Sequence, residues 1–149
     1  MSGKNQQSPV FGIIEHVDFP ELSISDVIAK IDTGAYSGAL HCSKIELIEQ
    51  NGASDILRFT PINDSAKQIE LTTFKTVYVR SSNGHRVRRF LIDTPIVIQG
   101  EQYSIRIGLS DRSSMKTDAL IGRRFLRSND VLVDVRINQE EDEDGGSKI

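Results

Sequence analysis

The chain has 149 residues, of which 38% are hydrophobic and 26% are charged, and its net charge is −3. These values are typical of one globular domain with a sizeable core. No apolar run approaches the ~20 residues of a membrane-spanning helix, and the first residues lack the apolar region of a signal peptide. The single cysteine, Cys42, excludes an internal disulfide. A cytoplasmic protein without a membrane partner is therefore predicted.

The acidic residues are concentrated at the C-terminal end. Residues 139–149 hold five acids and one lysine, which leaves 17 basic and 16 acidic residues in the rest of the chain. This balance gives no case for nucleic-acid binding. We expect residues 1–9 and the acidic tail 139–149 to be disordered, so that the domain covers 10–138.

Short β-type segments follow one another along this domain, with almost no helical periodicity. Residues 103–109 alternate between apolar and polar or small side chains, which is typical of a half-buried strand. Asn83-Gly84 lies between two β-type runs and is a strong hairpin signal. Strands are expected over 10–17, 27–31, 40–48, 56–59, 69–79, 87–92, 103–109, 119–121 and 131–135, and one or two helical turns over 122–127. This pattern favours a small all-β barrel or sandwich.

One segment has a clear chemical interpretation. In Ile31-Asp32-Thr33-Gly34-Ala35, an apolar strand end runs into an Asp-Thr-Gly turn. Such a strand delivers a carboxylate into a tight loop, where Gly34 allows a close backbone contact or a positive φ. Alone, the tripeptide more often marks an ordinary turn in which Asp32 caps its own backbone.

Three later segments make the motif more specific. They are Leu40-His41, the 109–115 run LSDRSSM and the 120–123 run LIGR. In this order and spacing, the four pieces resemble the bacterial and archaeal retropepsin-like family. That family is often labelled "ATP-dependent zinc protease", and some members accompany RimK-type ATP-grasp ligases. The resemblance covers residues 11–135.

The resemblance implies a closed, six-stranded acid-protease barrel with one short C-terminal helix. It also implies an aspartic endopeptidase, in which two carboxylates share one proton around a water. Because the chain has one Asp-Thr-Gly, the second carboxylate would be Asp32 of the other subunit of a homodimer. The implied roles are catalytic for Asp32, Thr33 and Gly34, substrate-binding for Ala35, Asn83, Gly84, Arg112 and Met115, and structural for Leu40, His41, Gly122 and Arg123. The hairpin around Ser82-Asn83-Gly84 would cover the substrate.

Several residues depart from the retroviral pattern. Tyr36 stands where a carboxylate usually pairs with the Arg of the 120–123 run, so Arg123 must find another partner. Arg86, Arg88 and Arg89 make the hairpin basic, which would favour acidic peptides. The alternative function is an inactive peptide-binding module of the same fold that partners an ATP-grasp ligase. A further alternative places the acidic tail in the basic groove as a self-inhibitor.

The zinc and ATP of the family label have no support in the sequence. His16, His41, Cys42 and His85 lack the spacing of a zinc site, and no Gly-rich phosphate loop occurs, so neither a metal nor another cofactor is expected. Cys42 has no activating neighbour and is expected to be a small buried residue. Asp93-Thr94-Pro95 is not a second catalytic motif, because Pro95 cannot replace Gly34. It is interpreted as a break between a strand and a turn.

For the 109–115 run, a polar loop with a local pair of Asp111 and Arg112 is as plausible as a role in the substrate groove or in a dimer contact. If exposed, that pair would be worth under ~1 kcal/mol. Met115 is more readily explained as core filling than as a specific ligand contact.

Overall fold

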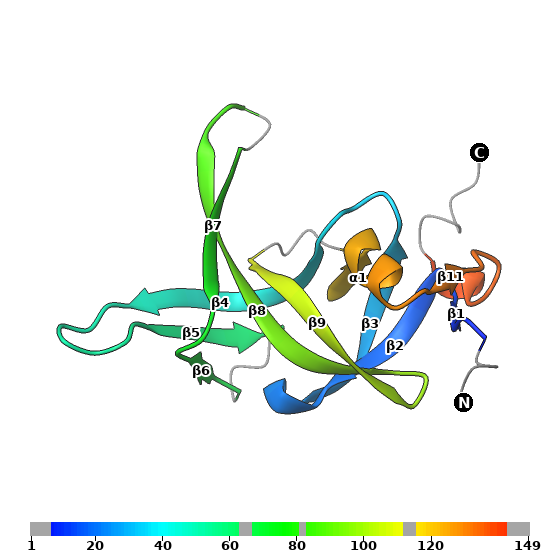
Figure 1. Cartoon of the computed structure of the whole chain (residues 1–149), viewed down its shortest axis with the longest axis horizontal. Coiled ribbons are helices and arrows are strands. Elements are labelled where there is room, and N and C mark those ends of the chain that lie inside the picture. The colour runs from blue at the N-terminus through cyan, green and yellow to red at the C-terminus, as the bar shows by residue number, and fades with distance from the viewer. Residues whose placement is uncertain (1–6, 63–66, 81–82, 112–115, 143–149) are drawn as a thin grey trace.

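Nearly all regular elements of the protein are strands (Figure 1). The computed structural model describes residues 7–62, 67–80, 83–111 and 116–142. In chain order the elements are β1 (Val10–Phe11), β2 (Ile14–Phe19), the 3-10 helix η1 (Pro20–Leu22), β3 (Ile24–Asp32), β4 (Gly38–Ile48), β5 (Ile56–Pro61), β6 (Ile69–Leu71), β7 (Lys75–Arg80), β8 (Arg86–Ile98), β9 (Glu101–Ser110), β10 (Ala119–Gly122), α1 (Arg123–Ser128), β11 (Leu132–Val133) and η2 (Gln139–Glu141).

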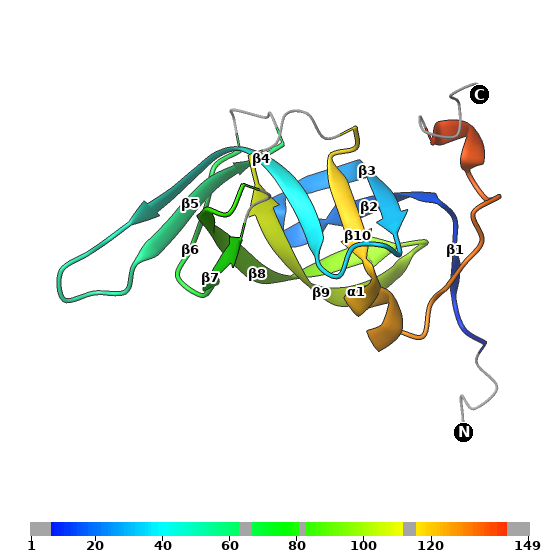
Figure 2. The ribbon, with the colours of Figure 1, turned by 90° about the horizontal axis from the view of Figure 1, so that it is seen from above.

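Six of the strands close into a barrel. Strands β10, β3, β2, β8, β9 and β4 are neighbours in this order, and the pairing of β4 with β10 completes the ring (Figure 2). The β3–β10 and β4–β9 pairings are parallel, and the other pairings in the ring are antiparallel. The predicted all-β, six-stranded closed barrel with a short C-terminal helix is confirmed. No helix in the described part of the chain is long and apolar enough to cross a membrane.

The barrel interior follows from the alternation of side chains along each strand. In β8, Phe90, Ile92, Ile96 and Ile98 are buried, while the residues between them are more exposed, apart from Thr94. Ile107 of β9 packs in the same hydrophobic core. Burying an apolar side chain of this size is worth about 1.5–3 kcal/mol. This core holds the strand ends that carry the candidate site in place.

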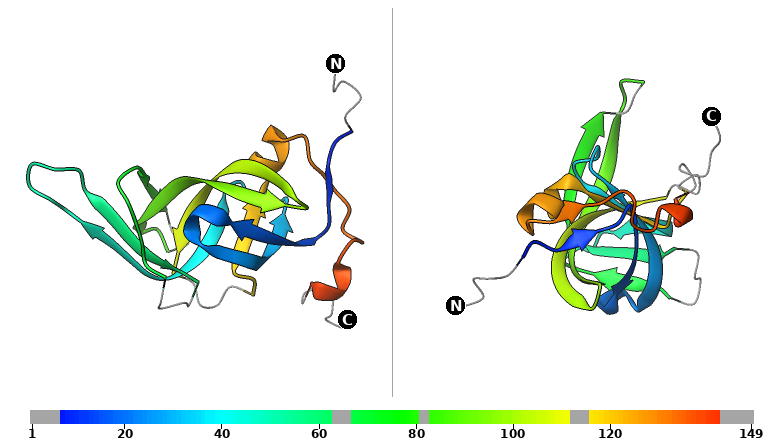
Figure 3. Two further views of the ribbon diagram at one scale, coloured as in Figure 1. Left: turned by 90° about the horizontal axis from the view of Figure 1, so that it is seen from below. Right: turned by 90° about the vertical axis from the view of Figure 1, so that its right-hand side faces the viewer.

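Two hairpins extend beyond the barrel (Figures 1 and 3). One is formed by β4 and β5. The other is formed by β7 and β8, whose pairing runs from Lys75↔Leu91 to Arg80↔Arg86. At its tip Gly84 has a φ of 88°, the left-handed conformation that favours glycine in tight hairpin turns. The Asn-Gly hairpin predicted from the sequence is therefore present.

Two predicted strands are divided in the structure. The 10–17 segment breaks at Gly12, where a Cβ would lie 2.5 Å from the carbonyl oxygen of Ile137. The C-terminal segment crosses the chain at this point, and the Ile13 N–H donates to the same oxygen at 3.0 Å. The 69–79 segment breaks into β6 and β7 because β6 pairs with β5, whereas β7 pairs with β8.

Two other strand ends were predicted wrongly. Asp93-Thr94-Pro95 is not a turn, because β8 runs through it to Ile98. The pairing of β8 with β7 ends at Leu91, and its pairing with β2 begins at Val97. Between these two residues β8 pairs only with β9, so one of its edges is free for a proline. The last strand, predicted over 131–135, ends at Val133, because the carboxylate of Asp134 accepts the N–H of Arg136 at 3.0 Å and starts a turn.

The segment predicted to be a disordered acidic tail begins with the short helix η2, and residues 143–149 lie outside the described part. Glu141 Oε1 lies 2.6 Å from Nε2 of His16, and Asp26 Oδ1 lies 2.7 Å from its Nδ1. Asp142 forms a 2.8 Å ion pair with Lys30 of β3. These contacts attach the first acidic residues to strands β2 and β3, not to the β7–β8 hairpin.

We expect this attachment to depend on pH. The hydrogen bonds with Glu141 and then Asp26 raise the pKa of His16 above its usual value, because a protonated ring can donate to both carboxylates. The stabilisation should be fully present below about pH 6.5 and lost as pH rises through the raised pKa of His16. NMR titration of the His16 ring should show a lower pKa in Glu141→Gln and an unchanged one in Glu140→Gln. Equal values in all three proteins would show that Glu141 does not hold the ring.

Candidate active site

Asp32 ends β3 and lies half-buried at the start of a tight turn. Its Oδ1 accepts the N–H of Gly34 at 2.9 Å, and its backbone oxygen accepts the N–H of Ala35 at 3.2 Å. A Cβ on Gly34 would lie 3.2 Å from the same Oδ1, so the glycine gives the carboxylate room. The φ of Gly34 is not positive, and of the two roles considered for this glycine, close approach is the observed one.

The turn is supported from behind by β10 and α1. Gly122 is the parallel neighbour of Asp32, and the N–H of Arg123 donates to the Ala35 oxygen at 2.7 Å. A Cβ at Gly122 would lie 2.6 Å from the carbonyl oxygen of Tyr36, a distance that side-chain carbons do not tolerate. The 120–123 run therefore makes the predicted close approach to the Asp32 turn.

Arg123 replaces the missing carboxylate partner with two other contacts. Its Nη1 donates to the carbonyl oxygen of Gly34 at 3.0 Å, and its Cζ lies 5.5 Å from the centroid of the Tyr36 ring. A cation over a tyrosine ring is attracted by the negative face of the ring. The same side chain thus contacts the turn at two points.

Arg123→Gln should lower the free energy of unfolding by about 1 kcal/mol, because it removes a partly exposed charged donor and the contact with the ring. Chemical denaturation measures this change. Arg127→Gln is the matched control, since Arg127 lies on the same helix and its side chain has no hydrogen bond or ion pair with another described residue. Equal stabilities of the two variants would contradict the role given to Arg123.

A cavity of about 380 Å³, which we call the front cavity, lies between the turn and the β7–β8 hairpin. Asp32 is the one carboxylate among its described lining residues. The turn and β4 contribute Ala35, Ser37, Gly38 and Ala39, the hairpin contributes Val77, Val79, Arg89 and Leu91, and Gly108 and Leu120 complete the wall. The cavity thus brings a fixed carboxylate to a mostly apolar surface with one cationic side chain.

The strand register explains how Arg89 reaches the front cavity. Arg89 pairs with Val77, so both face inward, while Arg86 faces outward with its Cζ 4.8 Å from the Tyr78 ring. A Cβ at Gly108 would lie 3.6 Å from Cδ of Arg89, so the glycine leaves room for the arginine stem. Arg89 is half-buried and forms no hydrogen bond or ion pair with another described residue.

The other predicted site residues are distributed differently. Asn83 and Gly84 lie at the tip of the hairpin and do not line the front cavity. Leu40 and His41 are buried in β4, and His41 is 4% exposed. Arg112 and Met115 lie outside the described residues. Arg89 was predicted only as one of three cations on the hairpin. The period-two pattern of the two hairpin strands is the signal that could have placed it in the cavity with Val77, Val79 and Leu91. The other lining residues not predicted for this site are Ser37, Gly38, Ala39, Gly108 and Leu120.

Cys42 is fully buried, and burial raises the pKa of its thiol to about 12, with the charge of Asp111 as a second cause. The thiol therefore stays protonated and is a poor nucleophile. Within the described ranges, no three His, Cys, Asp or Glu side chains gather as a metal-binding group.

Comparison with known proteins finds relatives named as ligases. A protein named "Probable alpha-L-glutamate ligase" from Shewanella pealeana is 30% identical over 129 residues, which cover 84% of this chain. A protein of the same name from Desulfotalea psychrophila is 25% identical over 127 residues. The chain spans 28% and 27% of the length of these two relatives.

A solved structure shares the fold. The crystal structure of a protein of unknown function from Legionella pneumophila subsp. pneumophila str. Philadelphia 1 matches 88% of this chain and 96% of its own, with a TM-score of 0.68 and 23% identity. A family model described as the retropepsin-like aspartic endopeptidase RimB matches residues 10–143. The chain therefore belongs to the RimB-like family of retropepsin-like aspartic endopeptidases.

Proposed function

We propose that the protein is an aspartic endopeptidase that acts as a homodimer. The observation that carries this proposal is the position of the Asp32 carboxylate. It accepts a hydrogen bond from the Gly34 N–H of its own turn and lines the front cavity beside the β7–β8 hairpin. In the dimer, the ionised Asp32 accepts a proton from the attacking water, and the protonated Asp32 of the other subunit donates its proton to the substrate carbonyl oxygen. Thr33 is exposed at the turn and would help to hold the two turns together.

The surface beside the turn is suited to a second subunit. A shallow depression of about 700 Å³ contains Thr33 and the apolar residues Leu126, Val131 and Leu132, beside three charged side chains. Leu132 and Val135 are each 60% exposed, which is high for aliphatic side chains near a core. Apolar surface next to an incomplete catalytic pair supports association of two copies through this side of the molecule.

We further propose that the substrates are acidic peptides. Arg89 places a cation in the front cavity without an acidic partner among the described residues. A guanidinium binds a carboxylate through two parallel hydrogen bonds, so an acidic side chain is its natural ligand. The naming of relatives as glutamate ligases is consistent with a glutamate-rich substrate.

Arg89→Gln should reduce kcat/KM for an acidic peptide by about tenfold or more, because a charged hydrogen bond is lost. It should leave a neutral peptide of the same length nearly unaffected. Arg86→Gln removes the same charge from the outward face of the hairpin and serves as the control. If Arg89→Gln lowered kcat/KM equally for the acidic and the neutral peptide, Arg89 would not be the residue that binds acidic side chains.

The second candidate is a peptide-binding module without hydrolysis that partners a glutamate ligase. It is favoured by the relatives, in which the matched region is 28% of a longer chain named as a ligase. Light scattering gives the oligomeric state, and peptide hydrolysis is scanned from acidic to neutral pH with and without a chelator. A dimer that hydrolyses peptides in the presence of the chelator supports the peptidase. A monomer that binds peptides without cleaving them at any pH supports the module.

A further inference from the structure

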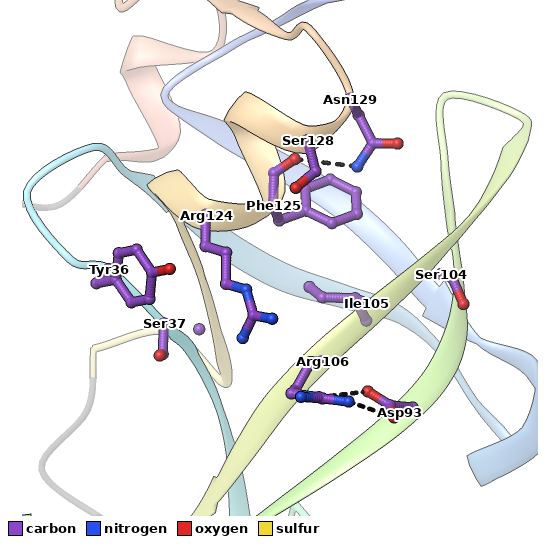
Figure 4. A pocket seen from close by; sticks show the side chains of 11 residues that line it. Tyr36, Ser37, Asp93, Ser104, Ile105, Arg106, Arg124, Phe125, Ser128 and Asn129 are labelled. Carbon is purple, nitrogen blue, oxygen red and sulfur yellow. Dashed lines mark hydrogen bonds and ion pairs between the residues drawn. The ribbon is translucent and has the colours of Figure 1, made fainter.

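A second cavity, which we call the back pocket, lies beside the segment that follows the Asp32 turn (Figure 4). Its volume is about 190 Å³. Tyr36 and Ser37 line it from the turn, Arg124 and Phe125 from α1, and Arg106 from β9. The back pocket and the front cavity meet at Ser37 and the residue after it, since both cavities are lined by these two residues.

The back pocket has a net positive charge. Arg106 is neutralised by two hydrogen bonds to Asp93, of 2.8 and 3.0 Å. The hydrogen bond from Arg106 lowers the pKa of Asp93, so this carboxylate remains charged and the pair is neutral. Arg124 has no side-chain hydrogen bond or ion pair with another described residue, and Figure 4 shows its guanidinium directed toward the space between Ser37 and Arg106. The charge of Arg124 also helps to lower the pKa of Asp93, so the two arginines and this carboxylate together leave one excess positive charge at the pocket.

We propose that the back pocket binds a carboxylate through the guanidinium of Arg124. A single excess positive charge matches a monoanion, whereas a phosphate dianion would leave one negative charge uncompensated in the pocket. At about 30 Å³ per water, the volume equals that of roughly six waters, which is enough for a carboxylate with a short aliphatic stem. The stem would lie against the ring of Phe125, which lines the same pocket.

A carboxylate bound in this pocket would contact Arg124, whose backbone also holds the segment after the Asp32 turn. The backbone N–H of Arg124 donates to the carbonyl oxygen of Tyr36 at 3.1 Å. The ligand is either an acidic side chain of a peptide that also occupies the front cavity or a small free carboxylic acid. The first source rests on the proposed function, whereas the second does not. The shared chemistry is the carboxylate.

Propionate is the probe, with propionamide as its neutral match and sodium chloride at equal ionic strength. In amide NMR spectra of the full chain, propionate should cause saturable shifts at Ser37, Arg124 and Ser128. Arg124→Gln should weaken this binding at least tenfold, and Arg127→Gln, the same charge change on the same helix, should leave it unchanged. Shifts that persist in Arg124→Gln, or that propionamide or chloride reproduces, would overturn the proposal. Melting curves of Arg124→Gln and Arg127→Gln that match the wild-type curve would establish that both variants are folded.

The two sources are separated by adding an acidic peptide to the propionate-saturated protein. We use Asp32→Asn in this arm so that no peptide is cleaved. Displacement of propionate from the amides of the back pocket identifies the peptide side chain as the ligand. Simultaneous binding identifies a small free acid. If the protein neither binds nor cleaves peptides, the peptidase proposal fails, and the propionate experiment still decides whether Arg124 holds a carboxylate.

Discussion

Asp32→Asn is expected to remove peptide hydrolysis, with a loss of about 10²–10⁴-fold or more, the range attributed to general acid–base catalysis. In the proposed homodimer the substitution would change Asp32 in both subunits, so neither side chain could exchange a proton with water or substrate. The amide oxygen of Asn can still accept the Gly34 N–H that Asp32 Oδ1 accepts at 2.9 Å. The turn and the fold should therefore survive, and loss of activity should not reflect unfolding. Hydrolysis of an acidic peptide, followed by mass spectrometry across pH, measures the effect.

Asp55→Asn is the matched control for this experiment. Asp55 also accepts a backbone N–H, from Gln50 at 3.3 Å, but it lies by the loop that joins β4 and β5. Its substitution should leave kcat/KM within about twofold. Retention of full activity in Asp32→Asn would exclude the aspartic mechanism. If that activity were lost to a chelator, it would point instead to a metal-dependent hydrolase.

The strands could be predicted where local pattern and tertiary environment agree. The alternation in 103–109 and the Asn83-Gly84 signal depend on nearest neighbours only. The predicted strand and hairpin are both present, although the alternation of burial holds only as far as Ile107. The break at Gly12 depends on a contact with Ile137, which is distant in the chain. The strand through Pro95 depends on which edge of β8 is left unpaired. Both the strand break and the continuation through Pro95 depend on how the barrel closes, so neither could be predicted from a local sequence pattern.

The same distinction holds for the candidate site. The position of Asp32 and the approach of Gly122 behind it could be predicted, because each belongs to a short contiguous motif. The walls of the front cavity come from β7, β8 and β9, so they required the register of a hairpin folded over the turn. Arg89 was predicted to add charge to the hairpin, but only the register shows that it faces inward whereas Arg86 faces outward.

Gly122→Ala should both destabilise the protein and reduce its activity. The new Cβ would lie 2.6 Å from the carbonyl oxygen of Tyr36 and 2.8 Å from that of Ala35, and both belong to backbone that cannot rotate away. Overpacking of this kind costs about 1–3 kcal/mol and occasionally more. For a chain of this size, each kcal/mol corresponds to a fall in melting temperature of roughly 2–4 °C. Because Gly122 pairs with Asp32 and α1 is hydrogen-bonded to the Asp32 turn, we expect relief of the clash to displace the Asp32 carboxylate.

Gly52→Ala, at another turn, is the control that distinguishes the steric clash from the general cost of replacing a glycine. Gly52 has a φ of 74°, and a Cβ there would meet no atom within 4 Å. Gly52→Ala should therefore cost only about 1 kcal/mol from backbone strain and leave kcat unchanged. In Gly122→Ala, we expect kcat to fall even well below the melting temperature. If Gly122→Ala kept the wild-type kcat and had the same melting temperature as Gly52→Ala, that result would show that the close packing behind the turn does not position Asp32.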